Sequence, residues 1–427
     1  MKPAPKEAAP VLAGHAWLDA LGPQKIRPGL TRTRALLASL GNPERAFRTV
    51  LIGGTNGKGS TAAALASILK AAGIRAGLYT SPHLVRVTER IRIDEEDVAE
   101  GTLDRMLALL GAIAPAGARA PTYFEALTVA AIELFRRARV TVAVVEVGIG
   151  GSWDATNVLT PELSIVTNVG EDHLDVLGPT LADVARQKAG IFRRGIPALT
   201  AAAGDARAIL HQEAERLGAR LIDVSATDRF DRISPLLGSH QRRNLALAAA
   251  AAASLAPLTQ DVLVKGIAAL RWPGRLQRIV RPGRRELILD GAHNTDGARA
   301  LAAYLVEAGL SGRVDLLFGG LKDKDLPGMF ALLAPHVRRI VLVTPRSPRA
   351  ETAAGLAKRL GRAALEMASD PAAGLRLLDA DSGPDAGGRL GVDAIPIIAT
   401  GSLILVGDIL SGIEDDARAP WPGRAPA

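Results

Sequence analysis

Residues 48–61 read Arg48-Thr-Val-Leu-Ile-Gly-Gly-Thr-Asn-Gly-Lys-Gly-Ser-Thr61 and carry the strongest local signal in the chain. An apolar run predicts a buried strand, a glycine-rich loop with a lysine follows, and the next residues predict a helix. Glycines let backbone N–H groups converge on phosphate oxygens, and the helix N-terminus adds partial positive charge. The spacing is not the common G-x-x-x-x-G-K-[ST], because Ile52 and Gly59 interrupt it. We expect a nucleotide-binding loop formed by Gly54, Thr55, Asn56, Gly57, Lys58, Gly59, Ser60 and Thr61.

Outward from this loop, short apolar runs alternate with helical patterns such as 60–72 and 124–137. Strands are predicted at 48–53, 77–80, 140–147, 163–168 and 196–200, and in a second series at 286–290, 313–318, 339–343 and 394–399. This alternation is typical of parallel sheets covered on both faces. Pro and Gly in the stretch 271–275 predict a linker between the two series. We therefore expect an α/β fold with a P-loop domain over 1–280 and a smaller α/β domain over 281–427.

The composition excludes several classes of site. The chain has 427 residues, of which 48% are hydrophobic and 22% charged, so it is long enough for two or three domains and is not disordered overall. It contains no Cys, which excludes a disulfide framework, a thiolate metal site, an iron–sulfur cluster and a cysteine nucleophile.

The net charge is +8, which raises the question of nucleic-acid binding. Basic residues are spread thinly, with no run of five or more, and aromatic residues are only 3%, so we expect no nucleic-acid partner. Residues 1–21 lack the apolar stretch of a signal peptide, and the apolar run 245–256 is too short to span about 30 Å of hydrocarbon. We expect a soluble, cytoplasmic protein without membrane contact and, for lack of a long apolar stripe, a monomer.

Polar residues follow three of the predicted strands of the first series. Glu146 ends the apolar run 140–145, Ser81 follows the strand at 77–80, and His173 follows the strand at 163–168. Because strand ends of a parallel sheet meet at one edge, these groups and the Ser60 hydroxyl predict a magnesium site beside the loop. Lys188 has no role that its sequence pattern alone would assign.

Together with other segments, these motifs resemble the folylpolyglutamate synthase/dihydrofolate synthase family of Mur-type ATP-dependent amide ligases. The segments that match lie in order from about residue 50 to 407. They include the loop at 54–60, Thr80-Ser-Pro-His-Leu84, Tyr123-Phe-Glu125, Glu146-Val-Gly-Ile-Gly-Gly151, Lys188-Ala-Gly-Ile191, His240-Gln241, Trp272-Pro-Gly-Arg275 and Asp290-Gly-Ala-His-Asn294.

The resemblance implies a Rossmann-like glutamate-ligase domain at the C-terminus and ATP-driven amide synthesis through an acyl phosphate. The implied substrates are dihydropteroate, reduced folates and L-glutamate, with ATP and two Mg²⁺ ions. It further implies that Ser81, Glu146 and His173 bind Mg²⁺ and that Lys188 is carbamylated and helps to hold a second cation. The other roles it implies are nucleotide and phosphate contacts by Asn244, Arg275, Asp290 and His293, and a catalytic set of Lys58, Lys188, His173 and Arg275.

The pterin pocket is expected at Thr122, Tyr123, Phe124, Trp153 and Asp154. The family usually has Arg-Leu where this chain has Ser152-Trp153, so we expect one anion contact to be weakened. Trp153 either stacks on the pterin or p-aminobenzoate ring or packs the loop. Three activities remain open from the sequence: a bifunctional ligase, a monofunctional dihydrofolate synthase or other Mur-type ligase, and a P-loop protein with a regulatory role.

Overall fold

The computed structural model describes residues 12–22, 26–362, 364–380 and 395–416, with side chains described up to residue 413. The prediction about a signal peptide in 1–21 falls largely outside these ranges. The chain divides into two compact units. The first comprises residues 1–81, 88–224 and 247–266, and the second comprises 82–87, 225–246 and 267–427. The predicted boundary is a single cut at residue 280, whereas the second unit also takes two short earlier segments.

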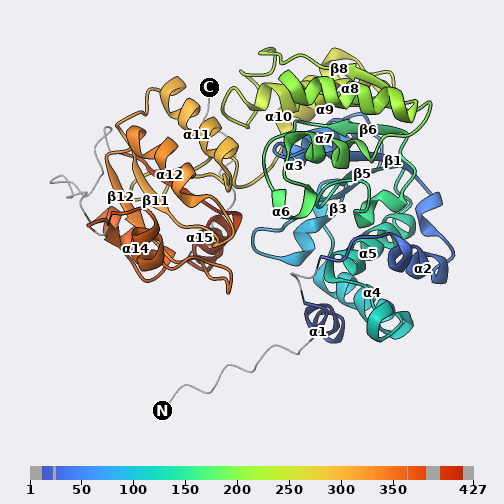
Figure 1. Cartoon of the computed structure of the whole chain (residues 1–427), viewed down its shortest axis with the longest axis horizontal. Helices are drawn as coiled ribbons and strands as arrows, with labels where there is room; N and C mark the ends of the chain where they lie inside the picture. Colours follow the sequence, from blue (N-terminus) through green and yellow to red (C-terminus); the bar gives the residue numbers. More distant parts are fainter. Residues whose placement is uncertain (1–11, 23–25, 363, 381–394, 417–427) are drawn as a thin grey trace. The chain divides into compact units, whose positions relative to one another are not determined.

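The helices of the described residues alternate with strands along most of the chain (Figure 1). They are α1 (Ala13–Ala20), α2 (Thr31–Ser39), α3 (Lys58–Ala71), α4 (Glu100–Ile113), α5 (Tyr123–Arg137), α6 (Leu174–Leu177), α7 (Leu181–Ala189), α8 (Gly204–Leu217), α9 (Gln241–Leu255), α10 (Gln260–Ala269), α11 (Thr295–Glu307), α12 (Leu326–Leu333), α13 (Ala353–Arg359), α14 (Pro371–Asp379) and α15 (Leu403–Asp416). Short 3-10 turns are η1 (Pro43–Arg45), η2 (Val87–Arg90), η3 (Gly117–Arg119), η4 (Ala155–Val158) and η5 (Ala334–His336).

The first unit is built on an eight-stranded sheet. In spatial order its strands are β4 (Glu96–Asp97), β3 (Ile91–Ile93), β2 (Ala76–Tyr79), β5 (Val142–Glu146), β1 (Arg48–Gly53), β6 (Leu163–Val166), β7 (Pro197–Thr200) and β8 (Arg220–Asp223). β1 is central and pairs in parallel with β5 and β6, with Ile52 opposite Glu146. β3 and β4 are antiparallel additions at one edge, so the predicted parallel sheet is correct at its centre and mixed at its border.

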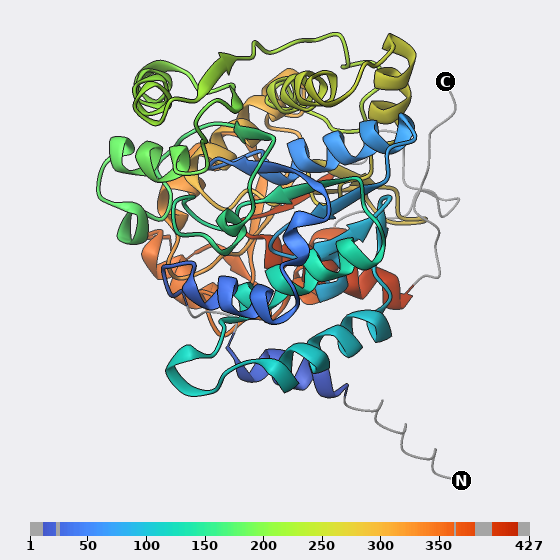
Figure 2. The ribbon, with the colours of Figure 1, turned by 90° about the vertical axis from the view of Figure 1, so that its right-hand side faces the viewer.

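Helices cover the strands of the first unit, so β1, β5 and β6 are almost completely buried. α3 contacts β1, β2 and β5, and α5 contacts β2. Away from the sheet, α1 (dark blue) lies along α4 (turquoise) in both Figure 1 and Figure 2. Their close approach requires Gly14, because a Cβ there would lie 2.1 Å from the carbonyl oxygen of Asp104.

The second unit is built on a six-stranded sheet. Its strands, in spatial order, are β13 (Glu366–Met367), β12 (Arg339–Leu342), β11 (Asp315–Phe318), β14 (Ile397–Thr400), β10 (Leu287–Leu289) and β9 (Gln277–Ile279). β9 is antiparallel to β10 and the other pairings are parallel. The observed β14 begins at Ile397, three residues later than predicted, and residue 394 of the predicted strand lies outside the described residues.

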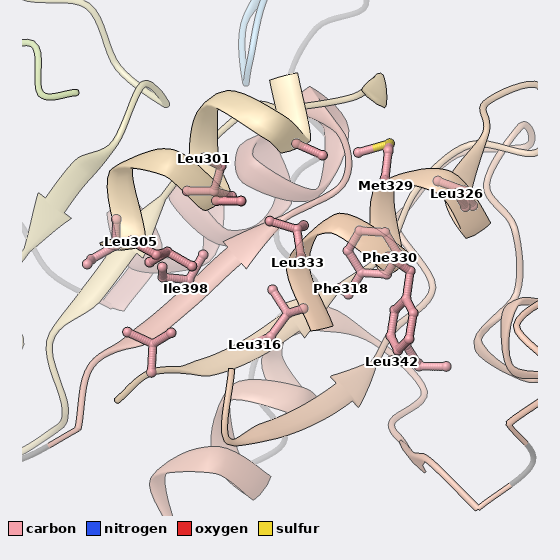
Figure 3. Packing of buried hydrophobic residues seen from close by; sticks show 14 of the residues in the cluster. Leu301, Leu305, Leu316, Phe318, Leu326, Met329, Phe330, Leu333, Leu342 and Ile398 are labelled. Carbon is pink, nitrogen blue, oxygen red and sulfur yellow. The ribbon is translucent and has the colours of Figure 1, made fainter. Parts of the chain in front are cut away.

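Apolar side chains fill both faces of this second sheet. Figure 3 shows one face, where α11 and α12 pack on β11, β12 and β14 through Leu301, Leu305, Leu316, Phe318, Leu326, Met329, Phe330, Leu333, Leu342 and Ile398. The opposite face is covered by α14 and α15, whose residues pack against Leu287, Leu317 and Val341. The central strands β10, β11 and β14 are therefore buried on both faces, as in a doubly covered sheet.

An ion pair lies inside the second unit. Asp315, fully buried at the start of β11, accepts hydrogen bonds from Arg285 Nη2 at 2.6 Å and from Arg338 Nη2 at 2.8 Å. Burial acts to raise the pKa of the Asp315 carboxyl, but the hydrogen bonds and charges of the two guanidinium groups outweigh it and hold this pKa below its usual value. Arg285 also donates to the carbonyl oxygens of Leu378 and Ile395, so its charge is compensated in the interior.

Within the described ranges, no helix combines the length and the apolar character needed to cross a bilayer.

Candidate active site

The loop between β1 and α3 has a backbone that only glycine accommodates at two positions. Gly54 has a φ of 140°, and a Cβ added there would lie 1.9 Å from Thr167 Oγ1. Gly57 precedes α3 with a φ of 82° and offers no side chain to the first N–H groups of the helix. Those N–H groups lack a side-chain acceptor at the cap, which is the arrangement that binds phosphate.

Polar residues that follow β6 hold this loop in place. Asn168 Oδ1 accepts hydrogen bonds from the backbone N–H of Thr55 at 3.2 Å and of Asn56 at 2.8 Å. Thr167 Oγ1 donates to the carbonyl oxygen of Asn56 at 2.7 Å. Sequence reasoning did not select Thr167 or Asn168, although a polar pair directly after a buried strand was an available signal. The loop is thus preorganised by the neighbouring strand.

Two lysines converge on one carbonyl oxygen of the loop. Lys58 Nζ donates to Gly54 O at 3.1 Å, and Lys188 Nζ, from α7, donates to the same oxygen at 2.9 Å. Lys188 is buried, and burial, reinforced by the Lys58 charge, lowers its pKa from 10.5 to about 7. Asp172 acts in the opposite direction but does not offset the burial. Lys188, to which only the family resemblance gave a role, therefore contacts the predicted nucleotide-binding loop directly.

The two hydroxyl residues of the loop lie at the start of α3. Ser60 and Thr61 are both buried. Thr61 Oγ1 has no hydrogen-bond partner among the described residues. A buried hydroxyl without a partner is costly, and a cation or a phosphate oxygen would satisfy it. The start of α3 therefore offers a buried oxygen suited to a divalent cation or to a phosphate oxygen.

Two of the predicted magnesium ligands meet at neighbouring strand ends. Glu146 ends β5, and its Oε2 accepts a hydrogen bond from the backbone N–H of Ser81, which follows β2, at 3.1 Å. Glu146 is 5% exposed, so its carboxylate is held in an interior position. The register that places Glu146 opposite Ile52 puts it at the same sheet edge as the loop.

His173 directly precedes the short helix α6 as its N-cap residue and has a left-handed backbone with a φ of 56°. Its Nε2 lies 3.9 Å from Asp172 Oδ1. The segment is tied to the loop because Thr55 Oγ1 donates to Gly170 O at 3.1 Å. No group of three or more His, Asp or Glu residues positioned to hold a metal occurs in the described part of the chain. The ligand set of Ser60, Ser81, Glu146, His173 and Lys188 therefore stays a prediction.

Thr122 and its neighbours form the start of α5. Thr122 Oγ1 accepts the N–H of Glu125 at 3.2 Å, and the Glu125 carboxylate accepts the N–H of Thr122 at 2.7 Å, which is a capping box. Arg32 Nη2 donates to Glu125 Oε1 at 2.7 Å. Thr122 is thus engaged with its own helix, and its predicted contact with substrate is not tested by this arrangement.

The next two residues offer aromatic surface. The Arg90 guanidinium lies 5.6 Å from the centroid of the Tyr123 ring, and burial raises the pKa of the Tyr123 hydroxyl. Phe124 is half-buried, with its ring centroid 6.0 Å from that of Tyr79. A Cβ at Gly148 would lie 2.6 Å from the Phe124 ring, so the loop after β5 runs directly against it.

Asp154 organises the loop that carries Trp153. Its Oδ2 accepts the N–H of Ile149 at 2.9 Å, and its Oδ1 accepts the N–H and the hydroxyl of Thr156 at 3.0 and 2.6 Å. Burial raises the pKa of the Asp154 carboxyl despite these bonds. Trp153 is half-buried, with Cζ2 3.5 Å from the position of a Cβ on Gly150. Asp154 therefore shapes the loop, and Trp153 supplies its ring surface.

In the second unit, Asp290 joins the linker to the end of β10. Its Oδ2 accepts the N–H of Leu276 and its Oδ1 accepts the N–H of Ala292, both at 3.0 Å. A Cβ at Gly291 would lie 2.5 Å from Arg275 Nη1, so the guanidinium passes directly over this glycine. The structure brings Asp290 and Arg275 together.

His293 and Asn244 have local partners in the same unit. His293 Nδ1 lies 2.9 Å from Gly291 O. Asn244 is buried near the start of α9, and its Nδ2 donates to Gln241 Oε1 at 2.7 Å. The proposed contacts of these residues with nucleotide stay predictions.

Comparison with known proteins decides the family. Residues 52–234 match the Mur ligase middle domain, and residues 274–386 match the glutamate ligase domain of Mur ligases. The dihydrofolate synthase/folylpolyglutamate synthase of Bacillus subtilis (strain 168) is 31% identical over 430 aligned positions, covering 92% of this chain and 97% of that protein. The chain belongs to the dihydrofolate synthase/folylpolyglutamate synthase family of Mur ligases.

Solved structures agree with this family across nearly the whole length. Escherichia coli FolC in complex with DHPP and ADP has a TM-score of 0.83 and 31% identity, covering 97% of this chain and 100% of that one. A bifunctional folylpolyglutamate synthase/dihydrofolate synthase with Mn, AMPPNP and L-glutamate bound has a TM-score of 0.80 and 30% identity, covering 94% and 98%. For this member of the dihydrofolate synthase/folylpolyglutamate synthase family, the predicted fold of two α/β domains is confirmed.

Proposed function

We propose that the chain is an ATP-dependent ligase that adds L-glutamate to dihydropteroate, forming dihydrofolate, and to reduced folates, forming folylpolyglutamates. The observation that carries the proposal is the convergence of Lys58 and Lys188 on the Gly54 carbonyl of a preorganised phosphate loop. The relatives named above support the substrates, since their structures hold DHPP, L-glutamate and adenine nucleotides. In this proposal residues 1–280 bind ATP and the pterin, and 281–427 contribute to glutamate ligation.

The proposed reaction has two balanced steps. A carboxylate oxygen of the pterin substrate attacks the γ-phosphorus of ATP, the bond to the β–γ bridging oxygen breaks, and ADP leaves. The amine of L-glutamate then attacks the carbonyl carbon of the acyl phosphate, loses a proton, and inorganic phosphate leaves with the bonding electrons. Both steps spread negative charge over phosphoryl or carbonyl oxygens, so catalysis depends on cationic groups and N–H donors.

This chain supplies such groups from its own residues. The N–H groups at the start of α3 face the phosphates, and Lys58 turns from the Gly54 carbonyl to the phosphate oxygens. Arg275 and His293 are proposed as further phosphate contacts. Two Mg²⁺ ions would be held by Ser60, Ser81, Glu146, His173 and modified Lys188, and would neutralise phosphate charge during transfer.

We propose that Lys188 is carbamylated. With a pKa lowered to about 7, its amine is largely neutral at slightly alkaline pH and can attack CO₂, forming an N–C bond and releasing one proton. The product is an anion beside the loop in place of a cation, and it can serve as an oxygen ligand. Electron density of a CO₂-equilibrated, nucleotide-bound crystal tests this, and unmodified lysine density would contradict it.

The pterin pocket is proposed between α5 and the loop 148–154. Tyr123, Phe124 and Trp153 supply ring surface for a planar substrate, while Thr122 and Asp154 hold the backbone that presents them. In this chain the indole of Trp153 stands at a position where the family usually has Leu, and we assign it a stacking role.

One assay tests the function and separates its versions. Phosphate release from ATP is measured with L-glutamate plus dihydropteroate, and separately with L-glutamate plus tetrahydrofolate. Release with both substrates is expected of the bifunctional ligase, and release with dihydropteroate alone selects the monofunctional dihydrofolate synthase. Release with neither would refute the folate assignment.

We further propose that the enzyme acts as a monomer in the cytoplasm and without nucleic acid. The thin spread of its basic residues and its low aromatic content support the last point. Light scattering after gel filtration measures the mass, for which 44.5 kDa is expected. A mobility shift with single-stranded DNA at several salt concentrations is expected to show no tight binding.

A further inference from the structure

Three side chains of different chemistry gather at the bare face of Gly150, in the loop after β5. Gly150 has a φ of 67°, and a Cβ placed on it would lie 2.9 Å from Leu177 Cδ2, 3.5 Å from Trp153 Cζ2 and 3.8 Å from Gln187 Oε1. The three residues come from α6, the loop itself and α7. A methyl group, an indole edge and an amide oxygen therefore surround one small region of the first unit.

The amide oxygen in this group is unsatisfied. Gln187 Oε1 is buried and accepts no hydrogen bond within the described part of the chain. Its residue is nevertheless firmly placed, because the main-chain oxygen of Gln187 accepts the N–H of Ser152 at 3.1 Å. A buried acceptor without a donor destabilises the ligand-free protein, and an arriving N–H donor would remove that cost.

The position of this oxygen ties it to the proposed reaction. Gln187 is the residue before Lys188, and Gly150 lies four residues after Glu146, on the loop that follows β5. An acceptor next to an indole suits a planar heteroaromatic ring that carries N–H groups, because such a ring can stack on the face of the indole and donate a hydrogen bond to the acceptor. The terminal torsion of a glutamine is soft, so the amide can turn its oxygen toward such a ring without moving α7.

We propose that Gln187, acting with Trp153, is a specificity-determining contact for the N–H-bearing pterin ring of the substrate. The inference rests on the proposed function, and it adds a residue that neither the motifs nor the resemblance selected. Gln187 acts on substrate binding and ring selection, and the phosphoryl transfer itself remains with the loop and its lysines.

The test uses Gln187→Met in the full-length enzyme, because methionine has a similar length and no acceptor oxygen. The KM for dihydropteroate is expected to rise about three- to tenfold, the loss of one hydrogen bond, while the KM values for ATP and L-glutamate stay unchanged. The melting temperature of the ligand-free variant is expected to stay equal or rise, because the unsatisfied oxygen is gone. Gln187→Glu keeps an acceptor and is expected to retain the wild-type KM for dihydropteroate.

Gln212→Met, on the exposed side of α8, is the matched control and is expected to change none of these values. Trp153→Leu is the second variant and is expected to raise the same KM. An unchanged KM for dihydropteroate in Gln187→Met, or an equal rise for all three substrates, overturns the inference. Absence of wild-type activity with dihydropteroate would instead refute the proposed function, so the two failures are distinguishable.

Discussion

Replacing Lys188 by methionine should remove a pH-dependent cost to stability. Lys188 is buried, its Nζ donates to the Gly54 carbonyl at 2.9 Å, and burial together with the Lys58 charge lowers its pKa from 10.5 to about 7. Methionine fills a similar volume without a charge. Every other titrating group is shared by the two proteins, so the difference in their unfolding free energies isolates this one lysine.

The sign and size of the effect follow from linkage. Between pH 7 and 10.5 the unfolded chain binds a proton at residue 188 that the folded chain does not, so the stability of the wild type rises with pH in that window and is flat below it. The free-energy cost of the buried amine is on the order of 5 kcal/mol at pH 6.5 and about 2 kcal/mol at pH 9. The stability of Lys188→Met relative to the wild type is therefore expected to fall by roughly 2–3 kcal/mol between pH 6.5 and pH 9.

Urea unfolding of the two proteins, followed by circular dichroism in CO₂-free buffers, measures this difference. CO₂ must be excluded because carbamylation of the wild type would replace the amine by an anion. A difference in unfolding free energy that does not change between pH 6.5 and 9 would show that Lys188 titrates normally, and the argument from its burial would be wrong. If the stability of Lys188→Met relative to the wild type increased with pH, the pKa of Lys188 would be raised in the folded protein instead of lowered.

Three further outcomes are expected. Gly54→Ala should abolish ATP binding in isothermal titration calorimetry, because its Cβ would lie 1.9 Å from a threonine hydroxyl at a φ of 140°. Lys58→Ala and Glu146→Ala should each lower turnover in the phosphate-release assay by at least about 100-fold, because each removes charge that stabilises phosphoryl transfer or holds the cation. Asp315→Ala should destabilise the second unit by about 3–5 kcal/mol in urea unfolding, because it leaves the buried Arg285 without its carboxylate.

Matched controls exist for two of these changes. Gly412 has no atom within 4 Å of an added Cβ, so Gly412→Ala is expected to leave ATP binding unchanged. Asp205 is exposed, so Asp205→Ala is expected to change stability by less than about 0.5 kcal/mol. Tight ATP binding by Gly54→Ala, near-normal turnover of Lys58→Ala, or full stability of Asp315→Ala would contradict the corresponding argument.

The central strands of both sheets were predicted from the sequence, whereas the strands at the sheet borders, and β3 next to the outermost strand β4, were not. β1 has the predicted bounds, 48–53, because its apolar run is continuous and ends at the glycine loop. The strands β3, β4, β8, β9 and β13 were not predicted. They are two to four residues long, and all of them except β3 carry exposed positions; in β8 both end residues are exposed. Border strands are stabilised by pairing with a neighbour, and local hydropathy does not record that pairing.

The same limit applied to the site. In the sequence, Lys188 looks like an ordinary lysine of a helix, because the carbonyl oxygen that it contacts belongs to Gly54, 134 residues earlier. Only the resemblance to the family predicted a role for it. No sequence motif or spacing pointed to a role for Gln187. Asp154 was predicted to contact the substrate; in the structure both of its carboxylate oxygens accept hydrogen bonds from the loop, and the substrate contact stays a prediction. A motif shows that a residue matters, and the packing decides whether it faces the ligand or supports the backbone.

The two lysines at the Gly54 carbonyl explain why this position suits ATP without reference to any relative. Two ammonium groups that share one acceptor repel each other, and burial of Lys188 strengthens the repulsion. Loss of the Lys188 proton, its conversion to a carbamate, and binding of a polyphosphate by Lys58 each relieve it. All three changes make the net charge beside the loop more negative. The two lysines therefore leave an excess of positive charge beside the loop, which the negative charge of a bound nucleotide would neutralise.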